Sequence, residues 1–150
     1  MSTVLVTGGA GFVGSTLALA LRRQGKAERV LAFDNLRRRG SELNVPRLRA
    51  AGVEFVHGDV RSPGDLAQVP RCDVLLDCAA EPSVQAGLSG SPGSVLEHNL
   101  VGTLNCLELA LRHSAAFLLL STSRVYPIAP LNGLPVVEES TRFRLSLIHI

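Results

Sequence analysis

Short apolar runs alternate with amphipathic segments along most of the chain. The apolar runs are predicted to form strands, over residues 3–7, 29–33, 53–57, 73–78 and 116–121. The segments between them have helical spacing or helix-start signals, over residues 12–23, 41–51, a short turn from Ser62-Pro63, and 94–113. This alternation is typical of a parallel sheet with helices on both faces. With right-handed crossovers, we expect the strand order 3-2-1-4-5.

Turn residues separate these elements. Ser41 is expected to cap the second helix, and Pro63 suits the first position of a helical turn. Residues 81–93 are rich in Gly, Ser and Pro, which predicts a loop. The run over 73–78 is nearly continuous in apolar residues, as expected for a strand buried on both faces.

The junction between the first strand and the first helix carries a glycine motif. The segment Thr7-Gly8-Gly9-Ala10-Gly11-Phe12-Val13-Gly14 has the spacing G-x-x-G-x-x-G. Gly8 allows a turn with positive φ, Gly11 allows a pyrophosphate close to the backbone, and Gly14 allows tight packing of helix on strand. The free N–H groups of the following helix would face the anion. This context predicts dinucleotide binding.

An acid follows the second strand at the distance that a dinucleotide site needs. Asp34 comes 20 residues after Gly14, and a carboxylate there can accept both hydroxyls of an adenine ribose. It would repel a 2′-phosphate, which favours NAD over NADP, although the arginines at 37–39 could hold that phosphate. The alternative for Asp34 is a simple turn aspartate.

Other strand ends carry further candidates, each with a structural alternative. Asp59, in Gly58-Asp59-Val60, could accept from an adenine amino group or form an Asx-turn. The small Ala79-Ala80 would let the backbone pass close to a cofactor, or reflects tight packing. Asn99 could brace the neighbouring loop, or be a solvated helix residue.

Composition narrows the class of protein. The chain has 150 residues, a net charge of +2 and 46% hydrophobic residues, which fits one globular domain. With few aromatics and no Trp, the arginine run gives no stacking surface for nucleic acid. No signal peptide or membrane-length apolar run is visible, and the three cysteines fit reduced thiols, so we expect a cytoplasmic protein. The four histidines show no metal-ligand spacing, so no metal is assigned.

Taken together, these motifs resemble the NAD-dependent epimerase/dehydratase family, the extended short-chain dehydrogenase/reductases that act on nucleotide sugars. The matching segments are TGGAGFVGS from Thr7, Asp34-Asn35-Leu36, Gly58-Asp59-Val60, Cys78-Ala79-Ala80, Asn99 to Thr103, and Ser121 to Tyr126. DNLRRRGSELN, AEPSVQAG and STSRVY are most similar to the CDP-paratose (CDP-tyvelose) 2-epimerase branch. The resemblance implies a Rossmann-type fold and a homodimeric parent protein whose substrate is a nucleotide-diphosphate sugar.

The resemblance also implies roles for individual residues. Phe12 and Val13 would lie beside the pyrophosphate, and Asp34 and Asn35 would hold the adenosine ribose. Asp59 and Val60 would flank adenine, whereas Ala79, Ala80 and Glu81 would line the nicotinamide side. Thr122 matches the family's Ser/Thr that hydrogen-bonds the sugar hydroxyl being oxidised. Asp77 departs from the His or Asn often seen in its strand, and could be a buried acid with hydrogen-bond partners that the sequence does not identify.

The family's catalytic Tyr and Lys, spaced Y-x-x-x-K, do not occur in this chain. Its one tyrosine is Tyr126, at a loop position of the family pattern, and its one lysine is Lys26. Residues 145–150 (LSLIHI) read like the translation of a transposase-based sequencing adapter, and the alternative is a genuine but divergent C-terminus, which the encoding DNA would decide. We therefore expect residues 1–144 to be a partial NAD-binding domain without the substrate lobe, binding NAD weakly and turning over no substrate.

Three functions remain for the parent protein. The first is a nucleotide-sugar epimerase, which passes a hydride to bound NAD and back. The second is a nucleotide-sugar 4,6-dehydratase, although Thr122 is followed by Ser123-Arg124 rather than by the Asp-Glu pair usual there. The third is a non-catalytic NAD-binding module, which a full-length sequence without Y-x-x-x-K would indicate.

Overall fold

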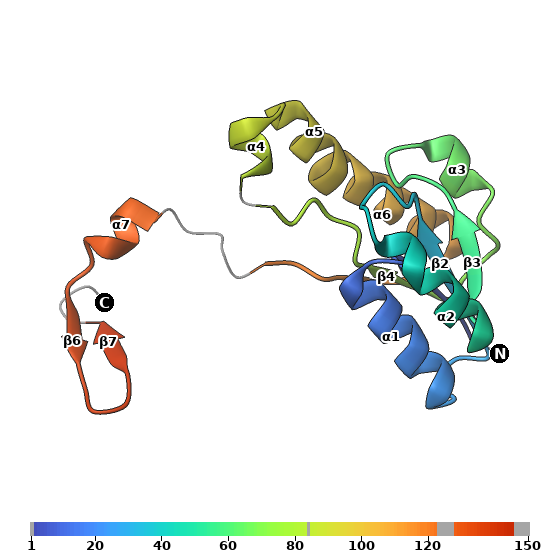
Figure 1. Ribbon diagram of the computed structural model, residues 1–150, viewed down its shortest axis with the longest axis horizontal. Coiled ribbons are helices and arrows are strands. Elements are labelled where there is room, and N and C mark those ends of the chain that lie inside the picture. The colour runs from blue at the N-terminus through green and yellow to red at the C-terminus, as the bar shows by residue number, and fades with distance from the viewer. Residues whose placement is uncertain (1, 84, 123–127, 146–150) are drawn as a thin grey trace. The chain divides into compact units, whose positions relative to one another are not determined.

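The computed structural model describes residues 2–83, 85–122 and 128–145 (Figure 1). The chain divides into two compact units, residues 1–120 and residues 121–150, and each is described by itself. The first unit holds the predicted strands and helices. The second is a short segment of one helix and one hairpin.

The first unit is built on a five-stranded parallel sheet. Its strands are β1 (Thr3–Thr7), β2 (Arg29–Asp34), β3 (Glu54–His57), β4 (Val74–Asp77) and β5 (Ala116–Leu119). They lie in the order β3-β2-β1-β4-β5, which confirms the predicted topology. In the central strand, Val4 pairs with Val30 of β2 on one side and with Val74 of β4 on the other.

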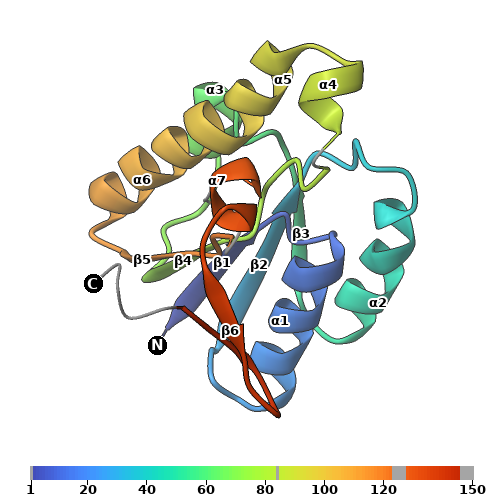
Figure 2. The ribbon, with the colours of Figure 1, turned by 90° about the vertical axis from the view of Figure 1, so that its left-hand side faces the viewer.

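Helices cover both faces of this sheet, as Figure 2 shows. One face carries α1 (Phe12–Arg23) and α2 (Asn44–Ala50), the latter preceded by the 3-10 turn η1 (Ser41–Leu43). The other face carries α3 (Pro63–Ala67) and α6 (Gly102–His113). Ahead of α6 lie α4 (Ala86–Ser89), α5 (Pro92–Leu96) and the π-helical turn η2 (Glu97–Val101).

The alternation of side chains along the strands makes two separate cores. Leu5 and Leu31 point to one face and pack with Leu66 of α3 and Leu109 of α6. Their strand neighbours point to the other face and pack with α1 and α2, in a cluster that contains Val4, Val6, Val30, Ala32, Ala18, Leu19 and Leu48. Both faces of β1 and β2 are therefore apolar, which explains why these strands read as continuous apolar runs.

Several boundaries differ from the prediction. The expected loop over 81–93 contains the single-turn helix α4, and the expected helix over 94–113 begins at Pro92 and includes η2. The last strand ends at Leu119 rather than at residue 121. Ser41 caps neither η1 nor α2, because it is the first residue of η1, whose N-cap is Gly40, while the N-cap of α2 is Leu43; its hydroxyl donates to the carbonyl of Arg38 at 2.7 Å. Ser62 does cap α3, and accepts from the Asp65 N–H at 3.2 Å.

The second unit contains elements that the apolar pattern did not predict. These are α7 (Ile128–Asn132) and an antiparallel hairpin of β6 (Val136–Glu138) and β7 (Phe143–Leu145). Glu139 forms ion pairs with Arg142 and Arg144. Leu145 ends β7, and the rest of the proposed adapter tail lies outside the described residues.

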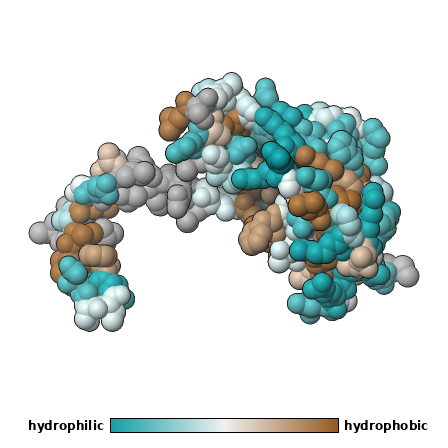
Figure 3. All heavy atoms as spheres, in the orientation of Figure 1, coloured by the Kyte–Doolittle hydropathy of each residue, from teal (hydrophilic) through white to brown (hydrophobic). Residues whose placement is uncertain are grey.

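Polar residues (teal) cover most of the face of the first unit seen in Figure 3, and apolar residues (brown) reach the surface in smaller patches. No helix in the described part of the chain is both long and apolar enough to span a bilayer. Within the same residues, no three His, Cys, Asp or Glu side chains are grouped as metal ligands.

Candidate functional site: a cavity at the strand ends

A cavity of about 700 Å³ opens at the carboxyl ends of the parallel strands in the first unit. Its volume is within the range of cofactor and ligand sites, and its position is where open α/β sheets bind ligands. It is lined by Gly8, Ala10 to Gly14, Phe33 to Asn35, Arg38 to Ser41, Asn44, Gly58, Val60, Cys78 to Ala80, Pro82 and His98. The residues predicted around a dinucleotide are therefore largely gathered in one place.

The glycine turn forms the floor of this cavity. Gly8 has φ +58°, and the Gly11 N–H donates to its carbonyl at 2.9 Å. A Cβ on Gly14 would lie 2.1 Å from the Gly8 oxygen, so α1 approaches the turn as only a glycine permits. A Cβ on Gly11 would meet a single neighbouring atom, the Gly8 oxygen at 3.0 Å, so the backbone there is open to a ligand.

The start of α1 offers unpaired backbone donors to this opening. Its N-cap is Gly11, which brings no side chain to bond the first N–H groups, and the first turn holds no acid. Phe12 is 88% exposed and Val13 is 44% exposed, so both side chains leave the helix start uncovered. Free N–H groups and the positive end of the helix dipole favour an anion at this point. The cradle thus fits a pyrophosphate.

Two side chains hold the peptide groups of Ala10, in the middle of the turn. The Ala10 N–H donates to Asp34 Oδ2 at 3.0 Å, and Asn44 Nδ2 donates to the Ala10 carbonyl at 2.9 Å. The other oxygen of Asp34 accepts from the Leu36 N–H at 2.8 Å. Asp34 is therefore both a turn aspartate and a cavity residue, since each carboxylate oxygen keeps a second lone pair. The sequence did not point to Asn44, which no local pattern marks.

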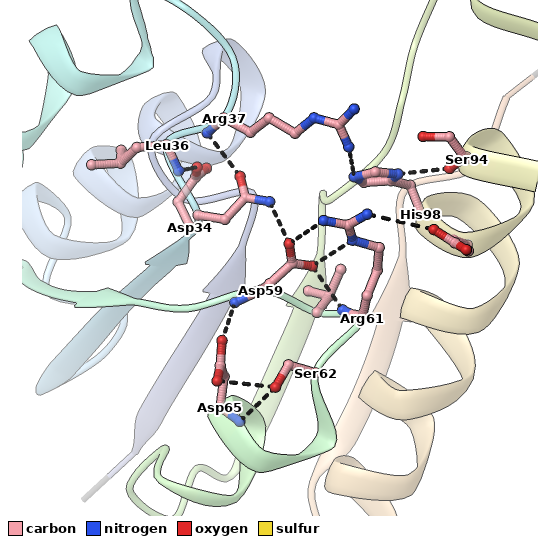
Figure 4. A network of polar contacts seen from close by, with 12 residues as sticks. Asp34, Leu36, Arg37, Asp59, Arg61, Ser62, Asp65, Ser94 and His98 are labelled. Atoms are coloured by element: carbon pink, nitrogen blue, oxygen red, sulfur yellow. Dashed lines mark hydrogen bonds and ion pairs between the residues drawn. The ribbon is translucent and has the colours of Figure 1, made fainter. Parts of the chain in front are cut away.

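A polar network lies next to Asp34, at the ends of β2 and β3 (Figure 4). Asn35 Nδ2 donates to Asp59 Oδ2 at 2.9 Å, and Arg61 binds both oxygens of Asp59, at 3.0 and 2.7 Å. The Arg61 N–H also donates to Asp59 Oδ1, which confirms the Asx-turn alternative for this residue. The bonds from Arg61 and Asn35 hold the pKa of Asp59 well below its usual range. Asp59 does not line the cavity itself, whereas its neighbour Val60 does.

Asp77 is a buried and hydrogen-bonded acid, which confirms the interpretation from the sequence and identifies its partners. It is 1% exposed, and its carboxylate accepts from the hydroxyls of Thr7 and Thr103, at 2.5 and 3.2 Å. The Ala79 N–H donates to the same group at 3.3 Å. These bonds tie the ends of β1 and β4 to α6, and so fix the strand end that carries Cys78, Ala79 and Ala80.

Asn99 braces the loop after β4, which confirms its predicted structural role. Its Oδ1 accepts from the Glu81 N–H at 2.7 Å, and its Nδ2 donates to the Glu81 carbonyl at 3.2 Å. Asn99 and the Glu81 side chain do not line the cavity, whereas Ala79, Ala80 and Pro82 do. The brace therefore acts on the shape of the cavity wall.

Thr122 belongs to the second unit, so its predicted contact with substrate stays a prediction. Tyr126, with Ser123 and Arg124, lies outside the described residues. Three cationic side chains complete the cavity region: Arg38 and Arg39 line it, and Arg37 contacts the lining residue His98.

Comparison with known proteins identifies relatives of this chain. The family model described as "NAD dependent epimerase/dehydratase family" matches residues 4–144. The CDP-paratose 2-epimerase of Salmonella typhi is 34% identical over 129 residues, which cover 82% of this chain and 37% of the relative. The dTDP-glucose 4,6-dehydratase of Mycolicibacterium smegmatis is 32% identical over 146 residues, covering 95% and 43%.

A solved structure shows the same fold. The UDP-glucose-4-epimerase from Stenotrophomonas maltophila, with bound NAD and formylated UDP-arabinopyranose, superposes with a TM-score of 0.73 and 28% identity. The match covers 84% of this chain and 38% of that one. The chain thus spans about two fifths of the length of these relatives.

Proposed function

The chain belongs to the NAD dependent epimerase/dehydratase family, and from this premise we propose that its first unit binds NAD in the cavity at the strand ends. The glycine cradle at the open start of α1 is the observation that carries the proposal. Its backbone donors would hold the pyrophosphate, while Asp34 and Asn35 would hold the adenosine ribose. Val60 would contact adenine, and Ala79 and Ala80 would border the nicotinamide, with the predicted Glu81 held beside them by Asn99 rather than lining the cavity.

The charges at the adenosine end support NAD rather than NADP. Asp34 lines the cavity and would repel a 2′-phosphate. Arg38 and Arg39 line it too, and they are the residues that could offset this repulsion. Calorimetric titration of the chain with NAD and with NADP measures whether the repulsion by Asp34 outweighs the attraction by the two arginines. We expect NAD to bind weakly, with a Kd between about 10 µM and about 1 mM, and NADP at least about tenfold more weakly.

Gly11→Asp tests the phosphate cradle directly. Aspartate is a good N-cap and Gly11 has a φ of −69°, but the new Cβ would lie 3.0 Å from the Gly8 oxygen, so the melting temperature of the variant is measured together with its NAD affinity. Its carboxylate would stand where the pyrophosphate is proposed to lie, and NAD binding should be lost while the fold is kept. Gly64→Asp is the matched control, because it adds the same charge to the first turn of α3, where a Cβ would meet only Ser62 Oγ at an ordinary 3.7 Å. Unchanged NAD affinity in Gly11→Asp, or no binding to the unaltered chain, would refute the proposal.

For the whole protein we propose a nucleotide-sugar epimerase. The resemblance of STSRVY to the 2-epimerase branch and the Salmonella typhi relative support this reading. Thr122 would bond the sugar hydroxyl that is oxidised, and NAD would accept the hydride and return it. A 4,6-dehydratase is the second candidate, supported by the relative that matches 95% of this chain. We expect the 150-residue chain alone to be inactive, since it lacks Y-x-x-x-K. Epimerisation by the purified chain would overturn that expectation, and a longer reading frame with Y-x-x-x-K would support an enzyme.

We also propose that the whole protein is a homodimer. Five exposed leucines form a stripe along one side of the helical segment from α5 to α6: Leu96, Leu100, Leu104, Leu107 and Leu111. An exposed apolar stripe of this kind is a surface that a second copy of the chain could cover. Sedimentation of the whole protein should show a dimer that Leu104→Glu converts to a monomer. A monomer before substitution would contradict this proposal.

A further inference from the structure

Three consecutive residues of the π-helical turn η2 each contact a different loop of the cavity region. Glu97 Oε2 lies 3.6 Å from Arg61 Nη1, in the loop after β3. His98 Nε2 lies 2.9 Å from Arg37 Nη1, in the loop after β2. Asn99 bonds both peptide groups of Glu81, in the loop after β4. One helical turn therefore contacts the loops that follow three of the five strands, β2, β3 and β4.

The first turn of α6 continues these contacts. A Cβ on Gly102 would lie 2.7 Å from Val60 Cγ2, so the helix approaches the loop after β3 closely. Asn105 Nδ2 donates to the Val60 carbonyl at 2.9 Å, and Thr103 donates to Asp77. These bonds fix α6 on the sheet, and η2 projects from this fixed base across the strand ends. π-Helical turns are rare and frequently occur at functional sites.

The contact between His98 and Arg37 depends on the state of the imidazole ring. His98 Nδ1 lies 2.7 Å from the Ser94 carbonyl, which can only accept, so Nδ1 carries the proton. Nε2 is then the acceptor that a guanidinium N–H requires. Figure 4 shows His98 between Ser94 and Arg37 in this arrangement. Ser94 lies on α5, so the ring links that helix to the loop after β2.

That loop forms the adenosine end of the cavity. It contains Asn35, Arg38 and Arg39, which line the cavity, and it follows Asp34 directly. Its other polar contacts are local or reach β3 and the turns that follow. The Leu36 N–H donates to Asp34, and the Arg37 N–H donates to Asn35. Asn35 donates to Asp59, and its carbonyl lies 3.3 Å from His57 Nε2. The Gly40 N–H donates to Glu42, and the Arg38 carbonyl accepts from the N–H and the hydroxyl of Ser41. The Arg37–His98 bond is a tie across the cavity, over 61 residues of sequence.

We propose that η2 is a positioning element of the cofactor cavity, and that His98 is the positioning residue that holds the loop over residues 35–40 at its adenosine end. The proposal rests on NAD as the proposed ligand, but the ordering of the loop is a property of the free chain. Arg37 and His98 touch no reacting atom in this scheme. They keep Asn35 and Arg38 where a nucleotide would meet them.

A series of substitutions at His98 tests this role. His98→Leu removes the acceptor, and His98→Lys places a cation against Arg37. His98→Gln keeps an acceptor on a side chain of similar reach, and is the conservative rescue. Since the pair is exposed, we expect His98→Leu to weaken NAD binding about threefold to fivefold, His98→Lys to weaken it more, and His98→Gln to stay within about twofold. Arg37→Glu added to His98→Lys should restore binding through a new ion pair.

Hydrogen exchange without nucleotide provides the second measurement. In His98→Leu and His98→Lys the amides of Leu36, Arg37 and Ser41 should exchange about threefold to fivefold faster, because the loop has lost its tie. His98→Gln should restore the slower exchange. Amides of β1 should not change in any variant, which separates an effect on the loop from an effect on the fold.

The outcomes separate this inference from the proposed function. If the unaltered chain fails to bind NAD, the proposed function fails, and loop exchange still decides the positioning role. If all His98 variants exchange and bind like the unaltered chain, the inference is wrong. It is equally wrong if His98→Gln is as impaired as His98→Leu, because that result would indicate a packing role for the ring.

Discussion

Gly14→Ala is expected to damage both the stability of the first unit and its phosphate cradle. The added Cβ would lie 2.1 Å from the Gly8 oxygen, 2.8 Å from the Gly8 carbonyl carbon and 3.0 Å from Gly9 Cα. All three atoms belong to the backbone, so no side chain can rotate away. Either the glycine turn or α1 must move by about 1 Å to restore an ordinary carbon–oxygen contact.

The size of the effect follows from two opposed contributions. Overpacking of this kind costs about 1–3 kcal/mol, and a contact with immobile backbone belongs in the upper part of that range. Alanine in a helix regains about 1 kcal/mol relative to glycine. The net loss is then about 1–2 kcal/mol, or roughly 3–8 °C in melting temperature for a domain of this size. NAD affinity should fall by at least about tenfold, since the displaced turn is the proposed phosphate site.

The matched control is Gly64→Ala in α3. A Cβ there would meet only Ser62 Oγ, at 3.7 Å, an ordinary contact. The same substitution should therefore leave stability equal or raise it by up to about 1 kcal/mol. Thermal unfolding by circular dichroism and calorimetric titration with NAD measure both quantities. The reasoning fails if Gly14→Ala unfolds at the same temperature as the unaltered chain and binds NAD equally well.

Three further predictions rest on single contacts. Asn44→Leu should weaken NAD binding about fivefold to thirtyfold, because the Ala10 carbonyl loses its partner; equal affinity by titration would exclude a role for the clamp. In the folded chain the pKa of Asp59 is lowered chiefly by its hydrogen bond to Arg61. The ionised Asp59 carboxylate therefore stabilises the fold at neutral pH, and this stabilisation is lost as the pH falls through the acidic range and the carboxylate is protonated. Arg61→Gln should therefore lower the unfolding free energy at pH 7, by a margin that narrows towards pH 3; a constant margin in urea titrations would contradict this. Burial raises the pKa of the Cys78 thiol to about 11, so its alkylation by iodoacetamide should accelerate about tenfold per pH unit from pH 7 to pH 9. Cys72 and Cys106 are buried and should stay unmodified in the folded chain. Peptide mass spectrometry measures the alkylation of each cysteine, and alkylation of Cys72 or Cys106 as fast as that of Cys78 would contradict this burial.

The fold could be predicted from local pattern because each strand carries its own signal. The sheet is buried on both faces, so β1 and β2 appear as unbroken apolar runs, and the turn after β1 is marked by its glycines. Asp34 could also be predicted, since the end of a strand places its side chain at the cavity, and Asn99 could be predicted as a residue that holds the neighbouring loop. The short helix α4 was not, because four residues in a Gly/Ser/Pro-rich segment give no periodicity to detect.

Contacts between segments that are far apart in the chain could not be predicted from the sequence. Asn44 and Ala10 are 34 residues apart, and nothing near Asn44 indicates that its amide reaches the glycine turn. Asp77 looked anomalous in a buried strand until Thr7 and Thr103 were seen to bond it, 70 and 26 residues away. His98 likewise has no motif, and its significance comes from Arg37 across the cavity. Such partners depend on the packing of helices on the sheet, which local propensity does not encode.

The cavity is held by side chains but would bind its ligand largely through backbone. Asp34 and Asn44 hold Ala10, and Gly8 holds Gly11, so the donors at the start of α1 are fixed before any ligand arrives. Substitutions other than proline leave the backbone N–H groups in place, and a cradle that is already ordered loses little entropy on binding. Residues 4–144 match the family model, and relatives named as an epimerase and as a dehydratase both match this region while extending well beyond it. A cofactor cradle that depends on so few side chains can serve different sugar chemistries, because the groups that select the substrate and the reaction can change without disturbing it.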